Sequence, residues 1–396
     1  MSGPLSHLRI LDLSSVVMGP YCTMLLGDMG ADVIKIEKSS GDITRYVGPS
    51  RNDGMGSNFL NLNRNKRSMT LDLKSEKGHK ILLELVKNSD VIIHSFRAQT
   101  MQKLGLSYED VSAENKKIIY CGMYGYSQKG PYGPLPAYDD IIQAGSGVAS
   151  AQGEMTGEPQ YVSSLLADKT TGLIGLSTIL SALLYRVETG IGQEIEVPMY
   201  ESMVSYTMIE HMYGETFSPP IGNSFYSRAT SPYRKPYKTS DGYLGVLIYN
   251  DKQWASFLNI TDHQHLLEDE RFKNMNTRSK NTDYIYQLVE QIMSTKKTTE
   301  WVEVFKKGDI PFMPINYPKD LFHDPHLQYI NFFEKVNHPT EGEIRDIKFP
   351  VNFSKTPSKV KRLAPTLGEH NKETLGEIGY SNDEIEEIMS EYKSSR

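Results

Sequence analysis

Apolar runs of strand length recur through the first part of the chain, at residues 8–15, 32–37, 68–73, 90–96 and 117–126. Between the first two runs, Pro20 stands in the first turn of a predicted helix, a position that proline favours. Between the third and fourth runs, residues 75–89 carry apolar side chains at helical spacing. Strands that alternate with helices predict an α/β fold with a parallel, doubly wound sheet and right-handed crossovers.

The pattern changes after residue 213, where a Pro- and Gly-containing linker covers residues 217–223. Beyond it, a turn and strand are predicted at 239–249, helices at 252–258 and 282–293, and a helix followed by an extended piece at 298–315. This middle region therefore predicts a smaller α+β domain. Residues 342–354 are strand-like, and the tail predicts two short helices that separate at Gly379-Tyr380.

Composition limits the classes of protein that the chain can belong to. A chain of 396 residues is too long for one ordinary core, so two domains are expected. The net charge of -6 argues against a general nucleic-acid binder. Cys22 and Cys121 form no CxxC pair and are expected as free thiols of a cytoplasmic protein. The uncharged stretch from Thr170 to Tyr185 suits a buried core helix better than a membrane span.

Several common motifs are missing from the sequence. It holds no P-loop, no complete GxGxxG after a strand and no GxSxG elbow. His263 with His265, and His323 with His326, have metal-like spacing but lie in polar segments without cysteines or paired carboxylates. We therefore expect surface histidines, no metal and no permanently bound cofactor.

Asp168 stands at the head of a long apolar helix pattern. Small residues at Gly172, Gly175 and Ala182 predict that another element packs close to this helix. Leucines recur along it at residues 173, 176, 180, 183 and 184. Asp168 can be an N-cap, or it can be a nucleophile that the positive helix end keeps ionised at neutral pH. The local pattern does not separate these two interpretations.

Five ordered segments resemble the class III CoA-transferases, the CaiB/BaiF family that includes formyl-CoA:oxalate transferases. They are "LSHLRILDLSSVVMGPYCTMLLGDMGADVIKIEKSSGD", "NRNKRSMTLDLKSEKG", "PAYDDIIQAGSG", "LADKTTG" with "RVETGIGQEIEVPMYES", and "LGEHNKETLGEIG". The resemblance covers almost the whole chain. It implies that Asp168 attacks a donor acyl-CoA, that an aspartyl-CoA thioester follows through a mixed anhydride, and that a carboxylic acid then accepts CoA.

The resemblance also implies a set of CoA contacts, most of them in loops that follow strands. They are Val16, Val17, Met18, Lys38, Leu71, Asp72, Leu73, Lys74, Ser95, Phe96, Arg97, Lys103, Tyr138 and Asp139. Among these, Lys38 and Lys103 are expected to meet phosphate groups, and residues 71–74 to line the adenine. Tyr138 and Asp139 are expected near the thiol end.

The same resemblance implies how the chain is organised. Residues 1–213 form the first part of the large CoA-binding, Rossmann-like domain, 224–330 form the small domain, and 331–396 return to complete the large one. Family members form a homodimer in which two ring-like subunits interlock, so an interlocked homodimer is expected here.

Two departures from the family pattern bear on the substrate and the reaction. Formyl-CoA:oxalate transferases carry a run of glycines over the site, which residues 228–243 lack. The 2-methylacyl-CoA racemases of the family place a histidine where Tyr138 stands, so a transferase is favoured over a racemase. A non-catalytic CoA-binding protein is a third hypothesis, against which Asp168 argues. Arg228, Arg234 or Lys235 is a candidate to hold the second carboxylate of a dicarboxylic acid, although solvated loop charges fit these residues equally well.

Overall fold

The computed structural model describes residues 3–394, and these divide into two compact units. The large unit comprises residues 3–146, 163–205 and 328–394, and the second unit comprises 147–162 and 206–327. The predicted domain bounds (1–213, 224–330 and 331–396) stay a prediction. The units depart from them chiefly at 147–162, which pack with the second unit.

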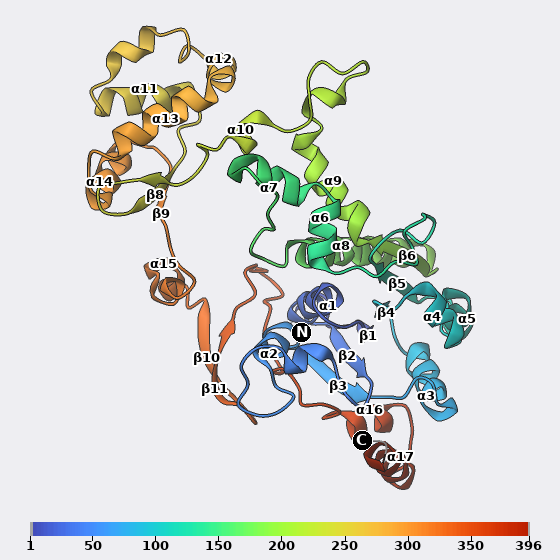
Figure 1. Ribbon diagram of the computed structural model, residues 1–396. Helices are drawn as coiled ribbons and strands as arrows, with labels where there is room; N and C mark the ends of the chain where they lie inside the picture. The colour runs from blue at the N-terminus through green and yellow to red at the C-terminus, as the bar shows by residue number, and fades with distance from the viewer. Residues whose placement is uncertain (1–2, 395–396) are drawn as a thin grey trace. The chain divides into compact units, whose positions relative to one another are not determined.

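A six-stranded parallel sheet forms the centre of the large unit (Figure 1). Its strands are β1 (Arg9–Leu13), β2 (Asp32–Glu37), β3 (Lys66–Thr70), β4 (Val91–His94), β5 (Ile119–Tyr124) and β6 (Gln193–Pro198). Their order is β3-β2-β1-β4-β5-β6, so the chain leaves β1 in one direction, returns, and continues from β4 in the other. This order is that of a doubly wound sheet, which confirms the predicted α/β class.

Helices and short 3-10 turns surround this sheet or connect its strands. In the large unit they are α1 (Met18–Asp28), η1 (Ile43–Tyr46), α2 (Ser57–Leu62), α3 (Glu76–Lys87), α4 (Ala98–Lys103), α5 (Tyr108–Glu114), α6 (Asp139–Gly145), α8 (Leu166–Thr189), α16 (Asn371–Glu377) and α17 (Asn382–Ser394). The hairpin of β10 (Phe333–His338) and β11 (Gly342–Ile347) belongs to the same unit. The four apolar side chains that predicted α3 are all fully buried: Ile81, Leu82, Leu85 and Val86.

The strand predicted at 68–73 is β3, which spans Lys66–Thr70. It begins two residues earlier because its first two residues are the cations Lys66 and Arg67. The ammonium group of Lys66 is fully buried and pairs with Asp12 of β1 at 3.0 Å. Arg67 pairs with Asp32 of β2 at 2.6 Å. An apolarity pattern misses such a strand because tertiary ion pairs offset the polarity of its first residues.

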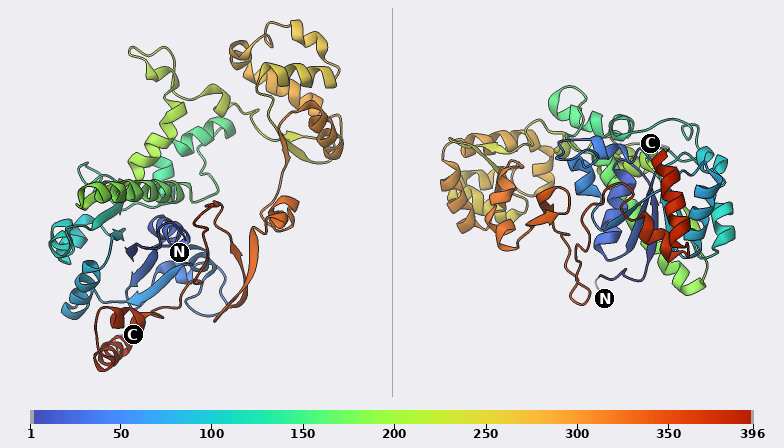
Figure 2. Two further views of the ribbon diagram at one scale, coloured as in Figure 1. Left: turned by 180° about the vertical axis from the view of Figure 1, so that it is seen from behind. Right: turned by 90° about the horizontal axis from the view of Figure 1, so that it is seen from below.

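The tail of the chain covers the outer edge of the sheet. The Thr70 backbone N–H donates to Asn371 Oδ1 at 2.8 Å, and the His370 N–H donates to the Ser68 carbonyl at 3.0 Å. Figure 2 shows α16 and α17 in red beside β3. The tail therefore satisfies backbone groups of β3 that an open edge would leave unpaired.

The second unit has its own apolar core beside a small antiparallel sheet of order β7-β8-β9. Trp254, Phe257, Trp301 and Phe305 form the centre of that core. Its elements are α7 (Val148–Thr156), η2 (Tyr213–Thr216), α10 (Ser227–Thr230), β7 (Tyr237–Lys238), β8 (Tyr243–Val246), α11 (Asp251–Ile260), η3 (Gln264–Glu268), α12 (Met275–Lys280), α13 (Thr282–Met293), α14 (Thr298–Gly308), β9 (Phe312–Pro314) and η4 (Asp320–His323). Two further helices, α9 (Met199–His211) and α15 (Pro325–Tyr329), cross from one unit to the other.

The close neighbour predicted for α8 is α1. A Cβ atom added at Gly172 would lie 2.9 Å from the Met18 carbonyl oxygen, and one at Gly175 would lie 2.8 Å from Met123 Cε. The opposite face of α8 is not buried in this chain, since Leu184 and Val187 are 69% and 81% exposed. The expected core helix is thus buried on one face only. Helix α8 is long and apolar enough to cross a bilayer, but core helices of soluble proteins can have the same length and composition.

Replacing Gly172 with alanine tests the approach of α8 to α1. Alanine normally favours a helix over glycine by about 1 kcal/mol, but here its Cβ atom would press on the backbone of α1. We expect Gly172→Ala to lower the free energy of unfolding by about 1–3 kcal/mol, measured by urea denaturation at fixed protein concentration. Gly376→Ala in α16 is the matched control, because no atom lies within 4 Å of the added Cβ. Equal stabilisation by both variants would contradict the close packing.

Candidate active site

Two cavities open at the carboxyl ends of the strands, on either side of β1 and β4. The first, of about 250 Å³, contains Asp168 and is called here the Asp168 cavity. The second, of about 320 Å³, contains Lys38 and is called the Lys38 cavity. Ser15 and Phe96 line both, so the two are neighbours. Ligands of doubly wound sheets bind where the strand order reverses, and β1 and β4 form that point here.

Most of the site residues inferred from the sequence line these cavities. Seven line the Asp168 cavity: Val16, Met18, Ser95, Phe96, Arg97, Tyr138 and Asp168. The Lys38 cavity is lined by Lys38, Leu71, Asp72, Leu73, Lys74 and, again, Phe96. Their roles toward CoA stay predictions.

Three of the inferred residues line neither cavity. Val17 is buried at the start of α1. Lys103 is exposed in the last turn of α4, and a different residue of that helix, Thr100, lines the Lys38 cavity. Asp139 is buried beneath the Asp168 cavity, with 4% of its surface exposed. The structure therefore places these three side chains away from the cavity walls.

Asp168 is the third residue of α8 rather than its N-cap. The N-cap position is occupied by Leu165, whose side chain accepts no hydrogen bond, so the N-cap interpretation is wrong. The Asp168 side chain is nearly buried, with 8% of the residue exposed, and it faces the cavity. Its own backbone N–H donates to Asp139 Oδ1 at 3.0 Å, and the Met18 N–H donates to its carboxylate.

The environment of Asp168 makes it an unusually weak acid. Burial raises the pKa of its carboxyl to about 7, the negative charge of Asp139 adds to the effect, and the hydrogen bond from Met18 opposes both. Desolvation therefore opposes the ionised form that the positive helix end was expected to favour. A carboxylate with such a pKa is a better nucleophile than an exposed aspartate, and its charge changes near neutral pH.

A buried ion pair holds the backbone turn that separates the two cavities. Lys35 Nζ lies 2.9 Å from Asp42 Oδ2 and donates to the Ser14 carbonyl at 2.9 Å. Asp42 Oδ1 accepts from the Val16 backbone N–H at 3.3 Å. Val16 has a φ of 70°, a strained conformation for a β-branched residue. The pair thus fixes both ends of a strained turn that lines the site.

Lys35 and Asp42 were not identified from the sequence, although both line the Lys38 cavity. The available signal was a lysine at the fourth position of the strand "DVIKIE", between the two isoleucines Ile34 and Ile36. A buried cation there requires an anionic partner, but a strand pattern does not reveal which residue provides it.

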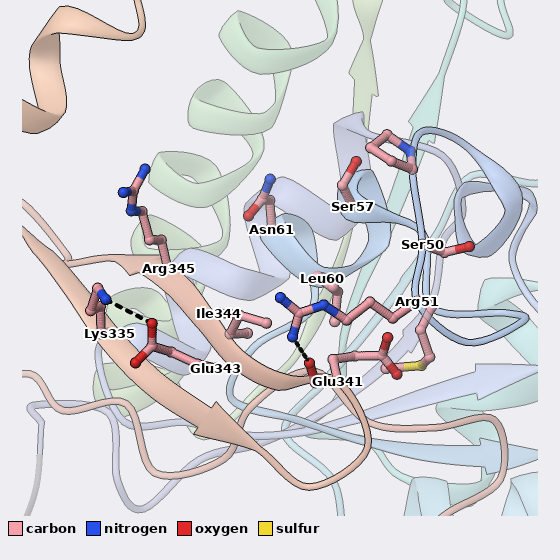
Figure 3. A pocket seen from close by; sticks show the side chains of 12 residues that line it. Ser50, Arg51, Ser57, Leu60, Asn61, Lys335, Glu341, Glu343, Ile344 and Arg345 are labelled. Atoms are coloured by element: carbon pink, nitrogen blue, oxygen red, sulfur yellow. Dashed lines mark hydrogen bonds and ion pairs between the residues drawn. The ribbon is translucent and has the colours of Figure 1, made fainter.

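The other cavities lie outside this site. A larger one, of about 540 Å³, lies between the β10–β11 hairpin and residues 49–61 (Figure 3). In it Lys335 pairs with Glu343 at 2.7 Å, and Arg51 donates a hydrogen bond to the Glu341 backbone carbonyl. In the second unit, Arg228, Arg234 and Lys235 line a cavity of about 410 Å³. Among the side chains that the structure describes, within residues 3–390, no group of three potential metal ligands occurs.

Comparison with known proteins connects this geometry to a family. The family model described as CoA-transferase family III matches residues 5–371. The chain is 32% identical over 392 residues to succinyl-CoA:glutarate CoA-transferase of Homo sapiens, across 98% of this chain and 89% of that protein. It is 30% identical to formyl-CoA:oxalate CoA-transferase of Rhodopseudomonas palustris (strain BisA53), across 98% and 97% of the two chains.

A solved structure gives the same result. The crystal structure of a CAIB/BAIF family protein from Brucella suis matches with a TM-score of 0.80 and 30% identity, across 96% of this chain and 100% of that one. The family resemblance inferred from the sequence motifs is therefore confirmed.

The raised pKa of Asp168 predicts a pH-dependent effect of Asp168→Asn on stability. With a pKa of about 7 folded and about 4 unfolded, Asp168 makes wild type lose stability as pH rises from about 4 to 7. The asparagine variant carries no such loss. We expect it to match wild type near pH 4 and to exceed it by roughly 2–4 kcal/mol at pH 8, measured by urea denaturation. Asp140→Asn, at an exposed position on α6, is the control. A difference that does not change with pH would contradict the shifted pKa.

Proposed function

Because this chain belongs to CoA-transferase family III, we propose that it transfers coenzyme A from an acyl-CoA donor to a carboxylic acid, with Asp168 as the nucleophile. The observation that carries this proposal is the Asp168 carboxylate itself. It is nearly buried, has a pKa of about 7, and faces a cavity at the switch point of a doubly wound sheet.

The proposed reaction retains the energy of the donor thioester through two kinds of covalent intermediate, a mixed anhydride and an aspartyl-CoA thioester. Asp168 attacks the acyl carbon of the donor, which gives a mixed anhydride and CoA thiolate. The thiolate then attacks the Asp168 carbonyl carbon and releases the donor acid, leaving an aspartyl-CoA thioester. The acceptor carboxylate attacks this thioester, which expels CoA thiolate and gives a second mixed anhydride. The thiolate then attacks the acceptor carbonyl carbon of that anhydride, which forms the new acyl-CoA and frees the Asp168 carboxylate. Burial around Asp168 supports the exclusion of water that both intermediates require.

The two neighbouring cavities support binding of CoA in an extended form. In this proposal the thioester lies at Asp168, and the nucleotide lies in the Lys38 cavity near Leu71 and Leu73. Lys38, Lys74 and Arg97 provide positive charge for its phosphates, as anionic nucleotides require. CoA acts as a substrate and not as a resident cofactor.

We propose a short dicarboxylic acid as the acceptor. The acids that follow the CoA donor in the two relatives' names are glutarate and oxalate, and both are dicarboxylic. Arg228, Arg234 and Lys235, which line one cavity of the second unit, stay the candidates to hold the second carboxylate. Lys235 is already paired with Glu290 at 3.1 Å, so the arginines are the stronger candidates. Oxalate itself is not favoured, because residues 228–243 lack the glycine run.

The racemase alternative requires a base for the α-proton, and Tyr138 provides no imidazole at its position. His94 directly precedes Ser95 of the Asp168 cavity, but it is fully buried between Tyr120 and Tyr124, and burial lowers its pKa to about 4. If the protein is a racemase, deuterium is expected to exchange into 2-methylacyl-CoA without a second acid. If it is a transferase, no such exchange is expected. The weakly acidic, cavity-facing Asp168 argues against a CoA-binding protein without turnover.

We also propose that the enzyme works in the cytoplasm as an interlocked homodimer. The exposed apolar side chains Leu184 and Val187 on α8 support a second copy as the cover for this helix face.

A transfer assay tests the proposed function. With succinyl-CoA and glutarate as substrates, the enzyme is expected to form glutaryl-CoA and succinate. The CoA esters are measured by mass spectrometry. Asp168→Asn is expected to lower the rate by about 10³-fold or more, because the nucleophile is lost. If the variant kept most of the wild-type rate with any acceptor, Asp168 would not be the nucleophile.

Single changes to the two arginines test the dicarboxylate proposal. Arg228→Ala or Arg234→Ala is expected to raise the KM for glutarate by about 10-fold or more, through loss of a charge-assisted hydrogen bond. The KM for butyrate, which lacks the second carboxylate, is expected to stay unchanged in the same variants. An unchanged glutarate KM in both variants would remove the arginines from acceptor binding.

A further inference from the structure

Helix α8 begins without a capping side chain of its own. Leu165 stands at the N-cap position and offers no acceptor, so the first backbone N–H groups need partners from elsewhere. One of these groups is the N–H of Asp168. It donates to Oδ1 of Asp139, a residue 29 positions earlier in the chain, at 3.0 Å. Asp139 therefore acts as the cap that the local sequence lacks.

Asp139 is held rigidly in this role by its own helix. It is the first residue of α6, and its second oxygen, Oδ2, accepts from Gln143 Nε2 at 2.6 Å. Gln143 also donates to the Ser164 carbonyl at 3.1 Å, which joins α6 to the segment just before α8. Because both carboxylate oxygens are engaged and the side chain lines no cavity, Asp139 does not face a substrate.

The same contact places a second negative charge beside Asp168. The other charged or titratable side chains that line the cavity are Arg97, Tyr124 and Tyr138. Lys169, the residue after Asp168, donates a hydrogen bond from Nζ to Ser164 Oγ at 2.6 Å. The negative charge of Asp139, which lies at the start of the neighbouring helix α6, raises the pKa of Asp168. Repulsion between two carboxylates makes the ionised nucleophile less stable.

We propose that Asp139 is a positioning residue with two separable roles, as the cap of α8 and as the charge that makes Asp168 reactive. This inference rests on the proposed function and replaces the prediction that Asp139 contacts CoA. When Asp168 becomes an anhydride or a thioester, it loses its negative charge while Asp139 keeps its own. Formation of either intermediate therefore relieves the repulsion, and Asp139 favours the covalent states.

Two substitutions separate the cap from the charge. Asp139→Asn keeps an oxygen acceptor for the Asp168 N–H but removes the charge. Leu165→Ser gives α8 a local cap, and its cost is small because Leu165 is 43% exposed. The double variant Leu165→Ser/Asp139→Asn carries the test if the single asparagine variant folds poorly. Asp140→Asn removes a neighbouring exposed charge from the same helix and is the control.

The first readout is the pH profile of the donor half-reaction. Single-turnover release of labelled succinate from succinyl-CoA is expected to rise with pH, with a midpoint near the Asp168 pKa. Asp139→Asn is expected to lower this midpoint by about one pH unit. The double variant Leu165→Ser/Asp139→Asn is expected to regain stability while its midpoint stays lowered. A midpoint equal to that of Asp140→Asn, or one that Leu165→Ser restores, would overturn the charge role.

The second readout needs no turnover. The pH-dependent stability gain of Asp168→Asn is measured in the wild-type and Asp139→Asn backgrounds by urea denaturation. The gain between pH 5 and pH 8 is expected to be smaller in the Asp139→Asn background, and an equal gain would overturn the coupling. If wild type releases no acid from any acyl-CoA donor, the proposed function fails, and this cycle still decides whether Asp139 controls Asp168.

Discussion

The close contact between α1 and the first turns of α8 is the constraint on which the site depends. Gly172 allows the α8 backbone to approach the Met18 carbonyl, and the Met18 N–H in turn donates to Asp168. A larger residue at 172 would separate the helices and move the carboxylate away from α1. The same contact takes Asp168 out of water, which is the main reason for its weak acidity. Packing and reactivity therefore arise from one feature of the fold.

The surrounding structure offsets the free energy that such a site costs. A buried carboxylate and a strained valine both destabilise the folded state. The Lys35–Asp42 pair fixes the Val16 turn, while Lys66 and Asp12 join two strands beneath it. The tail pairs with the edge of β3 from more than 300 residues away in sequence, with the Thr70 N–H bound to Asn371. These contacts keep the carboxyl ends of the strands fixed while the site itself remains strained.

The regular elements were predictable from local pattern because they bury apolar side chains at a fixed period. The strand at 32–37 and the helix at 282–293 match β2 and α13 residue for residue. Asp168 was identified through family motifs, and it faces a cavity. The pattern also predicted a close neighbour for α8, from Gly172 and Gly175.

What the sequence did not predict depends on contacts between distant residues. The cap of α8 comes from Asp139, so inspection of residues near 168 could not find it, and Leu165 occupies the N-cap position instead. The acidity of Asp168 depends on how deeply α8 is buried. Lys103 was inferred from motif position, but the end of α4 leaves it exposed. Each of these outcomes is set by tertiary packing rather than by local propensity.

Direct trapping of the covalent intermediate tests the central claim most simply. Wild type and Asp168→Asn are mixed with succinyl-CoA without acceptor, quenched, and measured by intact-protein mass spectrometry, with peptide mapping after hydroxylamine or borohydride treatment. The account predicts a CoA adduct on wild type that maps to Asp168 and is absent from the variant. A CoA adduct that maps to another residue, or tight CoA binding with no adduct from any acyl-CoA donor, would contradict it.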